Sequence, residues 1–187
     1  MIYPQKINSK KSTQIINIFL IASIIVAIVL VVINKLTTPG IPWSALANCG
    51  IIYIWITVMY SIKSGNNIAG HVLLQTILTS IVILYIDKTI GFRWWSLYIG
   101  IPIVLIVANI TMVILTIISY KKYIKYAIYQ LMIVLMSLMP VILVAKKIIE
   151  MKILIRIALE ISIFSLMISL ILCYKDIKEA IIRKLHM

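Results

Sequence analysis

The sequence predicts an all-α protein, a polytopic bundle of six transmembrane helices. Hydrophobic residues make up 63% of the chain and charged residues only 12%, and the mean hydropathy of +1.13 is far above that of soluble domains. The apolar residues gather in six runs, each close to the roughly 20 residues that a helix needs to cross a bilayer. The runs are continuous, whereas the strands of a membrane barrel alternate polar and apolar residues.

We predict one membrane domain over 1–187, with helices at 15–33, 44–62, 68–86, 96–118, 126–145 and 153–173. The first run follows Lys6, Lys10 and Lys11, as the apolar part of a secretory signal would. It is too long for such a signal and no small-residue cleavage site follows it. We therefore expect an uncleaved signal anchor.

The connections between the runs contain residues that end or begin helices. The stretch Pro39-Gly40-Ile41-Pro42 cannot continue a helix, and Ser44 is a favourable N-cap for the second one. Gly65-Asn66-Asn67 predicts a tight turn, so the second and third helices should form an antiparallel hairpin. Pro102 and Pro140 lie within the fourth and fifth runs and predict kinks there.

The distribution of lysine and arginine predicts the orientation, because these residues favour cytoplasmic loops. With six crossings, both termini and the second and fourth loops share one side. That side holds eleven basic residues, namely Lys6, Lys10, Lys11, Lys63, Lys121, Lys122, Lys125, Lys175, Lys178, Arg183 and Lys184. The other side holds seven, namely Lys35, Lys88, Arg93, Lys146, Lys147, Lys152 and Arg156. We therefore expect both termini in the cytoplasm, although the basic fifth loop runs against the rule.

The last residues, 175–187, place apolar side chains at helical spacing and predict an amphipathic cytoplasmic tail. The formal net charge of +13 has a related cause, since basic loops attract anionic lipid and fix topology. We therefore expect membrane lipids as partners, together with a homo-oligomer or a membrane-protein partner. No soluble domain remains to bind nucleic acid, so we expect no nucleic acid.

The sequence offers little catalytic chemistry. It contains no H-E-x-x-H, G-x-S-x-G or P-loop motif, and His71 and His186 are its only histidines. Cys49 and Cys173 are too few for a zinc cluster or a disulfide framework. We therefore predict no catalytic residues, no metal and no cofactor.

Charged residues inside the apolar runs are the first candidates for a site. Arg156 and Glu160 are four residues apart on the sixth helix and share a face. They either clamp this helix to its neighbours or form a ligand, ion or proton site that opens to the outer face. Asp87 and Arg93 lie on the same predicted side, so the four residues could line an outer vestibule, although charges at helix ends are also common without a function.

Uncharged polar residues form a second group within the runs. His71 and Gln75 are four residues apart on the third helix, and Asn109 lies in the fourth. Because lipid tails offer such groups no hydrogen bonds, we expect them to face other helices. Interhelical hydrogen bonding is therefore the role that we predict for them.

The stretch from 87 to 102 carries a pattern of separated residues, Asp87, Gly91, Trp95, Ser96, Tyr98 and Pro102. It resembles bacterial six-helix integral membrane proteins of unknown function whose members often carry an N-terminal zinc ribbon. Residues 3–8 resemble the linker that follows that ribbon. This chain has no paired cysteines before its first helix, so no metal role is carried over. The resemblance implies six helices, a bacterial cytoplasmic (plasma) membrane and interest in these residues, but no established activity.

Three functions are compatible with the sequence. The first is a noncatalytic scaffold, sensor or accessory subunit. The alternatives are a small transporter or channel component with an outer-facing acidic site at Glu160, and a membrane enzyme acting on lipid. A polar cavity reaching Glu160 would favour transport, and a lateral opening beside two carboxylates would favour an enzyme. A dry, filled bundle would favour the noncatalytic function.

Overall fold

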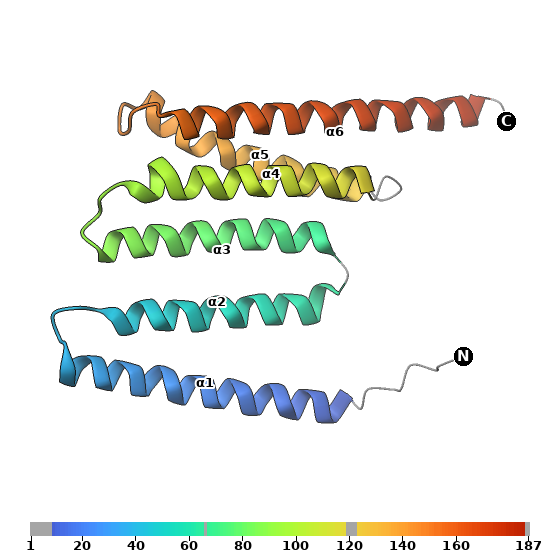
Figure 1. Ribbon diagram of the computed structural model, residues 1–187. Coiled ribbons are helices and arrows are strands. Elements are labelled where there is room, and N and C mark those ends of the chain that lie inside the picture. The colour runs from blue at the N-terminus through green and yellow to red at the C-terminus, as the bar shows by residue number, and fades with distance from the viewer. Residues whose placement is uncertain (1–8, 66, 119–122, 186–187) are drawn as a thin grey trace. The chain divides into compact units, whose positions relative to one another are not determined.

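The computed structural model describes residues 9–65, 67–118 and 123–185, and the side chains of 13–65, 67–118 and 126–171 (Figure 1). The described residues form helices and short loops, without a strand among them. The helices are α1 (Ser9–Thr37), α2 (Trp43–Ser64), α3 (Ile68–Thr89), a π-helix η1 (Ser96–Gly100), α4 (Ile101–Ile118), α5 (Tyr123–Ala145) and α6 (Ile153–Leu185). Six spans are long and apolar enough to cross a membrane, which indicates a multi-pass membrane protein.

The helices lie where the apolar runs predicted them, but their ends differ. α1 extends beyond 15–33 at both ends, because a helix need not end where the apolar residues end. The fourth run consists of η1 followed directly by α4. α6, red in Figure 1, continues without a break to Leu185, so residues 175–185 extend α6 instead of forming a separate helix. Residues 186–187 of the expected tail lie outside the described residues.

The chain divides into two compact units, residues 1–56 and 57–187, with the division inside α2. In the larger unit, α4 packs against α3, α5 and α6, and η1 packs against α3 and α6. Its apolar core contains Ala69, Ala108, Met112, Tyr126 and Ile133. Many large apolar side chains elsewhere are exposed, as expected for helices whose outer faces meet lipid.

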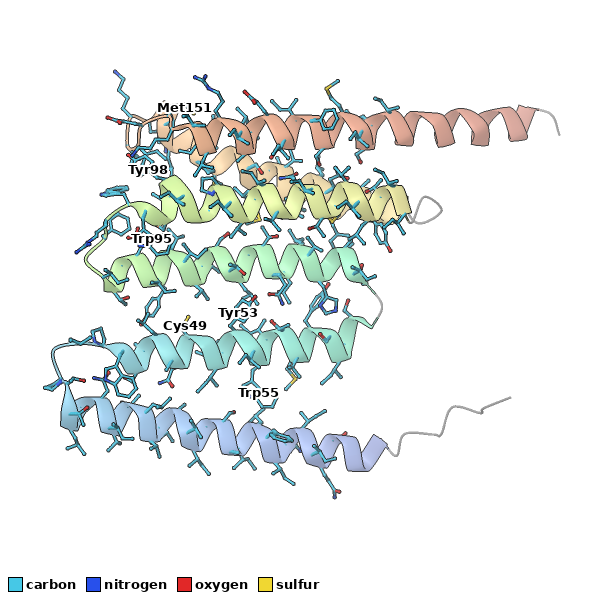
Figure 2. The ribbon with its side chains drawn as sticks, viewed as in Figure 1. Cys49, Tyr53, Trp55, Trp95, Tyr98 and Met151 are labelled. Carbon is cyan, nitrogen blue, oxygen red and sulfur yellow. The ribbon has the colours of Figure 1, made fainter. Side chains whose placement is uncertain are left out.

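In the smaller unit, hydrogen bonds join α1 to the first part of α2. The side chain of Asn34 donates to the carbonyl oxygens of Thr38 and Ile41, at 2.8 Å each, and accepts from the backbone N–H of Ser44 at 2.9 Å. Ser44 was predicted as an N-cap, but α2 begins at Trp43 and the side chain of Asn34 serves the N–H of Ser44. Further along, Trp55 donates from Nε1 to Oγ of Ser23 at 2.7 Å (Figure 2).

Close contacts position both ends of α3 in the larger unit. Asn67 caps α3 by accepting from the N–H of Gly70 at 3.3 Å, and its Nδ2 donates to the hydroxyl of Tyr129 in α5 at 2.7 Å. At the other end of α3, a Cβ on Gly100 would lie 2.6 Å from Cγ2 of Ile83. η1 can therefore approach α3 this closely only because residue 100 is glycine.

Candidate functional site: a buried polar cluster, a lateral groove and a basic bowl

A deeply buried polar cluster lies between α4, α5 and α6. Asn109 is 0% exposed, and its Nδ2 donates to the carbonyl of Leu105 at 2.9 Å, to Oγ of Ser162 at 3.0 Å and to Oγ of Ser137 at 3.3 Å. Each serine hydroxyl in turn donates to a carbonyl of its own helix, and so presents its oxygen to Asn109. One amide therefore joins three helices without a charge.

A second amide joins α5 to α6. Gln130 is buried, and its Nε2 donates to both the carbonyl and the hydroxyl of Ser165. The amide oxygens of these two residues, Oδ1 of Asn109 and Oε1 of Gln130, are buried and have no hydrogen-bond partner among the residues that the structure describes. Gln130 also lines a cavity of about 230 Å³ between α5 and α6. The two amides thus hold the helices together through their N–H groups.

Asp87 is fully buried at the end of α3, where its carboxylate organises the loop that follows. Oδ1 accepts from the backbone N–H of Arg93 at 3.0 Å, and Oδ2 accepts from the N–H and the hydroxyl of Ser96 at 3.3 and 2.6 Å. Gly91, Phe92 and Trp94 all have positive φ, at 97°, 53° and 65°. The structure therefore brings together Asp87, Gly91 and Ser96 of the sequence pattern as a loop that places the start of η1.

The structure does not bring Arg156 and Glu160 to this carboxylate. Both side chains are exposed on α6, whose buried face carries Ile155, Ala158 and Ser162. Among the described residues no ion pair joins them, and Arg93 contacts Asp87 through its backbone only. Among the described residues no hydrogen bond or ion pair joins Arg156 or Glu160 to Asp87 or Arg93, because helical spacing gives a shared face but does not decide which face packs. No group of three or more metal-ligating side chains occurs in the described part of the chain.

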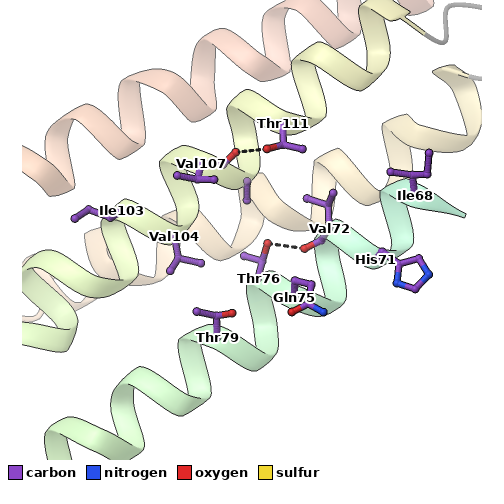
Figure 3. A pocket seen from close by; sticks show the side chains of 11 residues that line it. Ile68, His71, Val72, Gln75, Thr76, Thr79, Ile103, Val104, Val107 and Thr111 are labelled. Carbon is purple, nitrogen blue, oxygen red and sulfur yellow. Dashed lines mark hydrogen bonds between the residues drawn. The ribbon is translucent and has the colours of Figure 1, made fainter. Parts of the chain in front are cut away.

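A mainly apolar opening, the lateral groove, has a volume of about 420 Å³ and lies between α3 and α4 (Figure 3). It is lined by Ile68, His71, Val72, Gln75, Thr76 and Thr79 of α3 and by Ile103, Val104, Val107, Ala108 and Thr111 of α4. Thr76 and Thr111 donate to the carbonyls of Val72 and Val107 in their own helices, each at 2.7 Å, as the dashed lines show. These bonds leave methyl groups as the main surface of the walls.

Two of the polar residues of this lateral groove, His71 and Gln75, are already in contact with the end of α2. The ring of His71 meets that of Tyr60 edge to face, with centroids 4.8 Å apart, and Nε2 of Gln75 donates to Oγ1 of Thr57 at 3.1 Å. Sequence spacing correctly placed both residues on one face of α3. The groove itself also depends on how α4 packs against α3, which the sequence pattern did not indicate.

A basic bowl of about 480 Å³ lies where α5 ends and α6 begins, and sequence reasoning missed it. Its lining residues are Tyr98, Val144, Lys147, Ile148, Ile149, Glu150 and Met151. Figure 2 labels Tyr98 and Met151 in this region. The N–H of Glu150 donates to the hydroxyl of Tyr98 at 3.3 Å, and Nζ of Lys152 lies 4.1 Å from the centre of the same ring. Tyr98 therefore anchors the loop from η1.

The turn at the end of α5 contains a signal that could have located the basic bowl. Lys147 has a positive φ of 57°. Its N–H donates to the carbonyl of Val144 at 2.8 Å, and the N–H of Ile148 donates to the carbonyl of Leu143 at 3.0 Å. This pattern is the Schellman ending of a helix, in which the left-handed residue is usually glycine. In the sequence, Lys146-Lys147 follows the apolar helix directly and no glycine is present to end it. This indicates that a lysine takes the left-handed position.

Comparison with known proteins gives a family without an assigned activity. A model of a protein family described as a family of unknown function, DUF6320, matches residues 3–187. Neither the comparison with curated proteins nor the comparison with solved structures gave a match. The matched range contains all six spans, the buried amides, the lateral groove and the basic bowl. The chain therefore belongs to the DUF6320 family of unknown function.

Proposed function

We propose that this protein is a noncatalytic scaffold, sensor or accessory subunit that holds a transmembrane helix of a partner protein in the lateral groove between α3 and α4. The observation that carries this proposal is that the polar amides are used inside the bundle, while the walls of the groove are apolar. The buried amides of Asn109 and Gln130 bind serines within the bundle, whereas the groove walls are apolar and lie between two spanning helices. A space of this kind opens sideways, where only lipid or another helix can fill it.

A partner helix fits this groove better than a lipid tail does. Ala108 and three threonines line the groove with small side chains. Small residues let helix backbones approach each other closely in membranes. The partner is either another protein or a second copy of this chain.

The other two functions have less support. A transporter with an acidic site at Glu160 needs a polar passage to that carboxylate, but Glu160 is exposed on α6 and lines none of the three cavities described above. From the sequence we expect a lipid enzyme to have two carboxylates beside a lateral opening, and the lateral groove between α3 and α4 is lined by no carboxylate. The noncatalytic function asks for neither feature.

For the cellular setting we propose a bacterial cytoplasmic membrane with both termini in the cytoplasm. The excess of lysine and arginine in the termini and the second and fourth loops supports this orientation. The resemblance of residues 87–102 to bacterial six-helix proteins supports the location. No zinc is expected in this chain, because the cysteine pairs of the ribbon are missing before α1.

The test is copurification from a gentle detergent, with the groove filled in one variant. Val107 lines the groove and is 57% exposed, so Val107→Trp should fill the groove without disturbing the core. Ile110→Trp is the matched control, because Ile110 is 45% exposed on the same helix and does not line the groove. We expect a stoichiometric partner with the native protein and with Ile110→Trp, and its loss with Val107→Trp. Retention of the partner by Val107→Trp would contradict the proposal.

A further inference from the structure

We propose that the basic bowl at the loop between α5 and α6 binds the phosphate of an anionic lipid headgroup. This site is separate from the lateral groove, since its residues come from η1, from the last turn of α5 and from the loop that joins α5 to α6. It would anchor one specific class of lipid at the end of the bundle. The inference rests on the charge of the loop, the conformation of Lys147 and the position of the bowl.

The charge of the loop favours an anion. Residues 146–152 contain three lysines and one glutamate, which gives a net charge of +2. Lys152 already lies over the ring of Tyr98, and no ion pair joins Lys147 to Glu150 within the described residues. Glu150 contributes its backbone N–H to the hydroxyl of Tyr98, which holds the loop in place. Lys147 is therefore the cation of the basic bowl that is available to a ligand.

The backbone of Lys147 supports a role beyond packing. A left-handed residue at the end of a helix is normally glycine, because a side chain there meets the backbone. Strained non-glycine residues persist where the surrounding structure holds them, and they gather at binding sites. Here the loop is held by the buried side chain of Ile149 and by the bond from Glu150 to Tyr98. A lysine in place of glycine adds an ammonium to the lining of the basic bowl.

The position of the basic bowl favours a lipid over a free phosphate ion. It lies at the ends of two spanning helices, the level at which headgroups and interfacial tyrosines occur. Its lining also includes Val144, Ile148 and Met151, which can contact the glycerol and the upper acyl carbons of a lipid.

Thermal unfolding of the purified full chain in detergent tests this inference, because a ligand that binds the folded state raises Tm. The probes are short-chain phosphatidylglycerol, short-chain phosphatidylcholine and inorganic phosphate, each titrated separately. We expect phosphatidylglycerol to raise Tm in a saturable way, and the other two probes to have little effect. The midpoint of the titration gives an apparent Kd for the lipid.

The decisive variant is Lys147→Gly, because glycine suits the left-handed turn and removes the ammonium together with its side chain. Its Tm without lipid should equal or exceed that of the native protein, while its apparent Kd for phosphatidylglycerol should rise about tenfold. Lys146→Gln is the matched control, since Lys146 is the adjacent exposed lysine and does not line the basic bowl. This control should bind the lipid nearly as well as the native chain does.

Four results would overturn the inference. They are equal effects of phosphatidylglycerol and phosphatidylcholine, equal effects of the lipid and inorganic phosphate, native affinity in Lys147→Gly, and equal losses in Lys146→Gln and Lys147→Gly. The second result would assign the site to free phosphate, and the last would assign the effect to the diffuse charge of the loop. Val107→Trp should leave lipid binding unchanged, so failure of the groove proposal and failure of this one are distinguishable.

Discussion

Nδ2 of Asn109 in α4 lies 3.0 Å from Oγ of Ser162 in α6, and both residues are almost fully buried. The hydroxyl of Ser162 donates to the carbonyl of Ala158, so its lone pairs face the amide of Asn109. The same amide reaches Ser137 in α5. An apolar bundle thereby contains one point at which three helices must be in register for the hydrogen bonds to form.

Replacing this amide should loosen the bundle to a modest extent. Asn109→Leu removes the bonds to Ser137 and Ser162 but also the buried oxygen that lacks a partner. Because hydrogen bonds between membrane helices contribute about 1 kcal/mol each, we expect a loss of about 1 kcal/mol in the free energy of unfolding. The measurement is unfolding in mixtures of mild and denaturing detergent, followed by circular dichroism.

Thr116→Val is the matched control for this prediction. Thr116 is also buried in α4, but its hydroxyl donates only to the carbonyl of Met112 in the same helix, at 2.8 Å. We expect its stability to remain within about 0.5 kcal/mol of the native value. If Asn109→Leu were more stable than the native protein, a role in holding the helices would be contradicted, and the amide would need a functional explanation.

The loop after α3 should depend on the charge of Asp87. Asp87→Asn turns one acceptor oxygen into an N–H₂ group that faces the donors of Arg93 or Ser96. A buried donor without a partner costs about 1–3 kcal/mol, so we expect a loss of that size in detergent unfolding. A double-mutant cycle with Ser96→Ala should give a coupling of at least about 0.5 kcal/mol, and additive effects would show that the short contact contributes nothing.

Asn34 should control the order of the loop between α1 and α2. Asn34→Leu removes the acceptor of the Ser44 N–H and the two donated bonds to Thr38 and Ile41. Hydrogen exchange at the amide of Ser44 should become roughly fivefold faster, which corresponds to one lost bond of about 1 kcal/mol. Thr37→Val should leave this rate unchanged, because the hydroxyl of Thr37 bonds only within α1. Equal rates in the two variants would contradict the role of Asn34.

The orientation can be tested with single cysteines introduced after Cys49 and Cys173 are replaced by serine. Three spans separate Lys63 from Lys146, so the two positions should lie in opposite compartments. A membrane-impermeant thiol reagent should label Lys146→Cys in intact cells and Lys63→Cys only after lysis. The reverse pattern would place the termini outside, and labelling of both positions from one side would rule out the arrangement of six spans.

The helices were predictable because spanning length and apolar composition are local properties of the sequence. The start of α3 at Ile68 and the end of α5 at Ala145 agree with the expected boundaries. The start of α2 could not be predicted from Ser44 alone, because its N–H is served by Asn34 from the preceding helix. Likewise, nothing in the composition of residues 96–100 distinguishes the turn of a π-helix from that of an α-helix.

The candidate sites were harder to predict because they depend on which helix faces are packed. Asn109 was expected to bond across helices, and the structure gives its partners as Ser137 and Ser162, which carry no unusual signal in the sequence. Arg156 and Glu160 attracted attention because they are charged, yet they lie exposed and without an ion pair among the described residues. The lateral groove arises from the spacing of α3 and α4, which no single run of residues records.

The π-helix at Ser96–Gly100 sets the angle between the two ends of the fourth span. In this turn the N–H of Ile101 donates to the carbonyl of Ser96, five residues back, instead of four. This turn therefore contains one residue more than an α-helical turn, and each residue rotates an α-helix by about 100°. Deleting one residue here would rotate Tyr98 about a quarter of the circumference relative to Asn109. The hydroxyl that anchors Glu150 and the amide that binds Ser162 could then no longer both meet their partners.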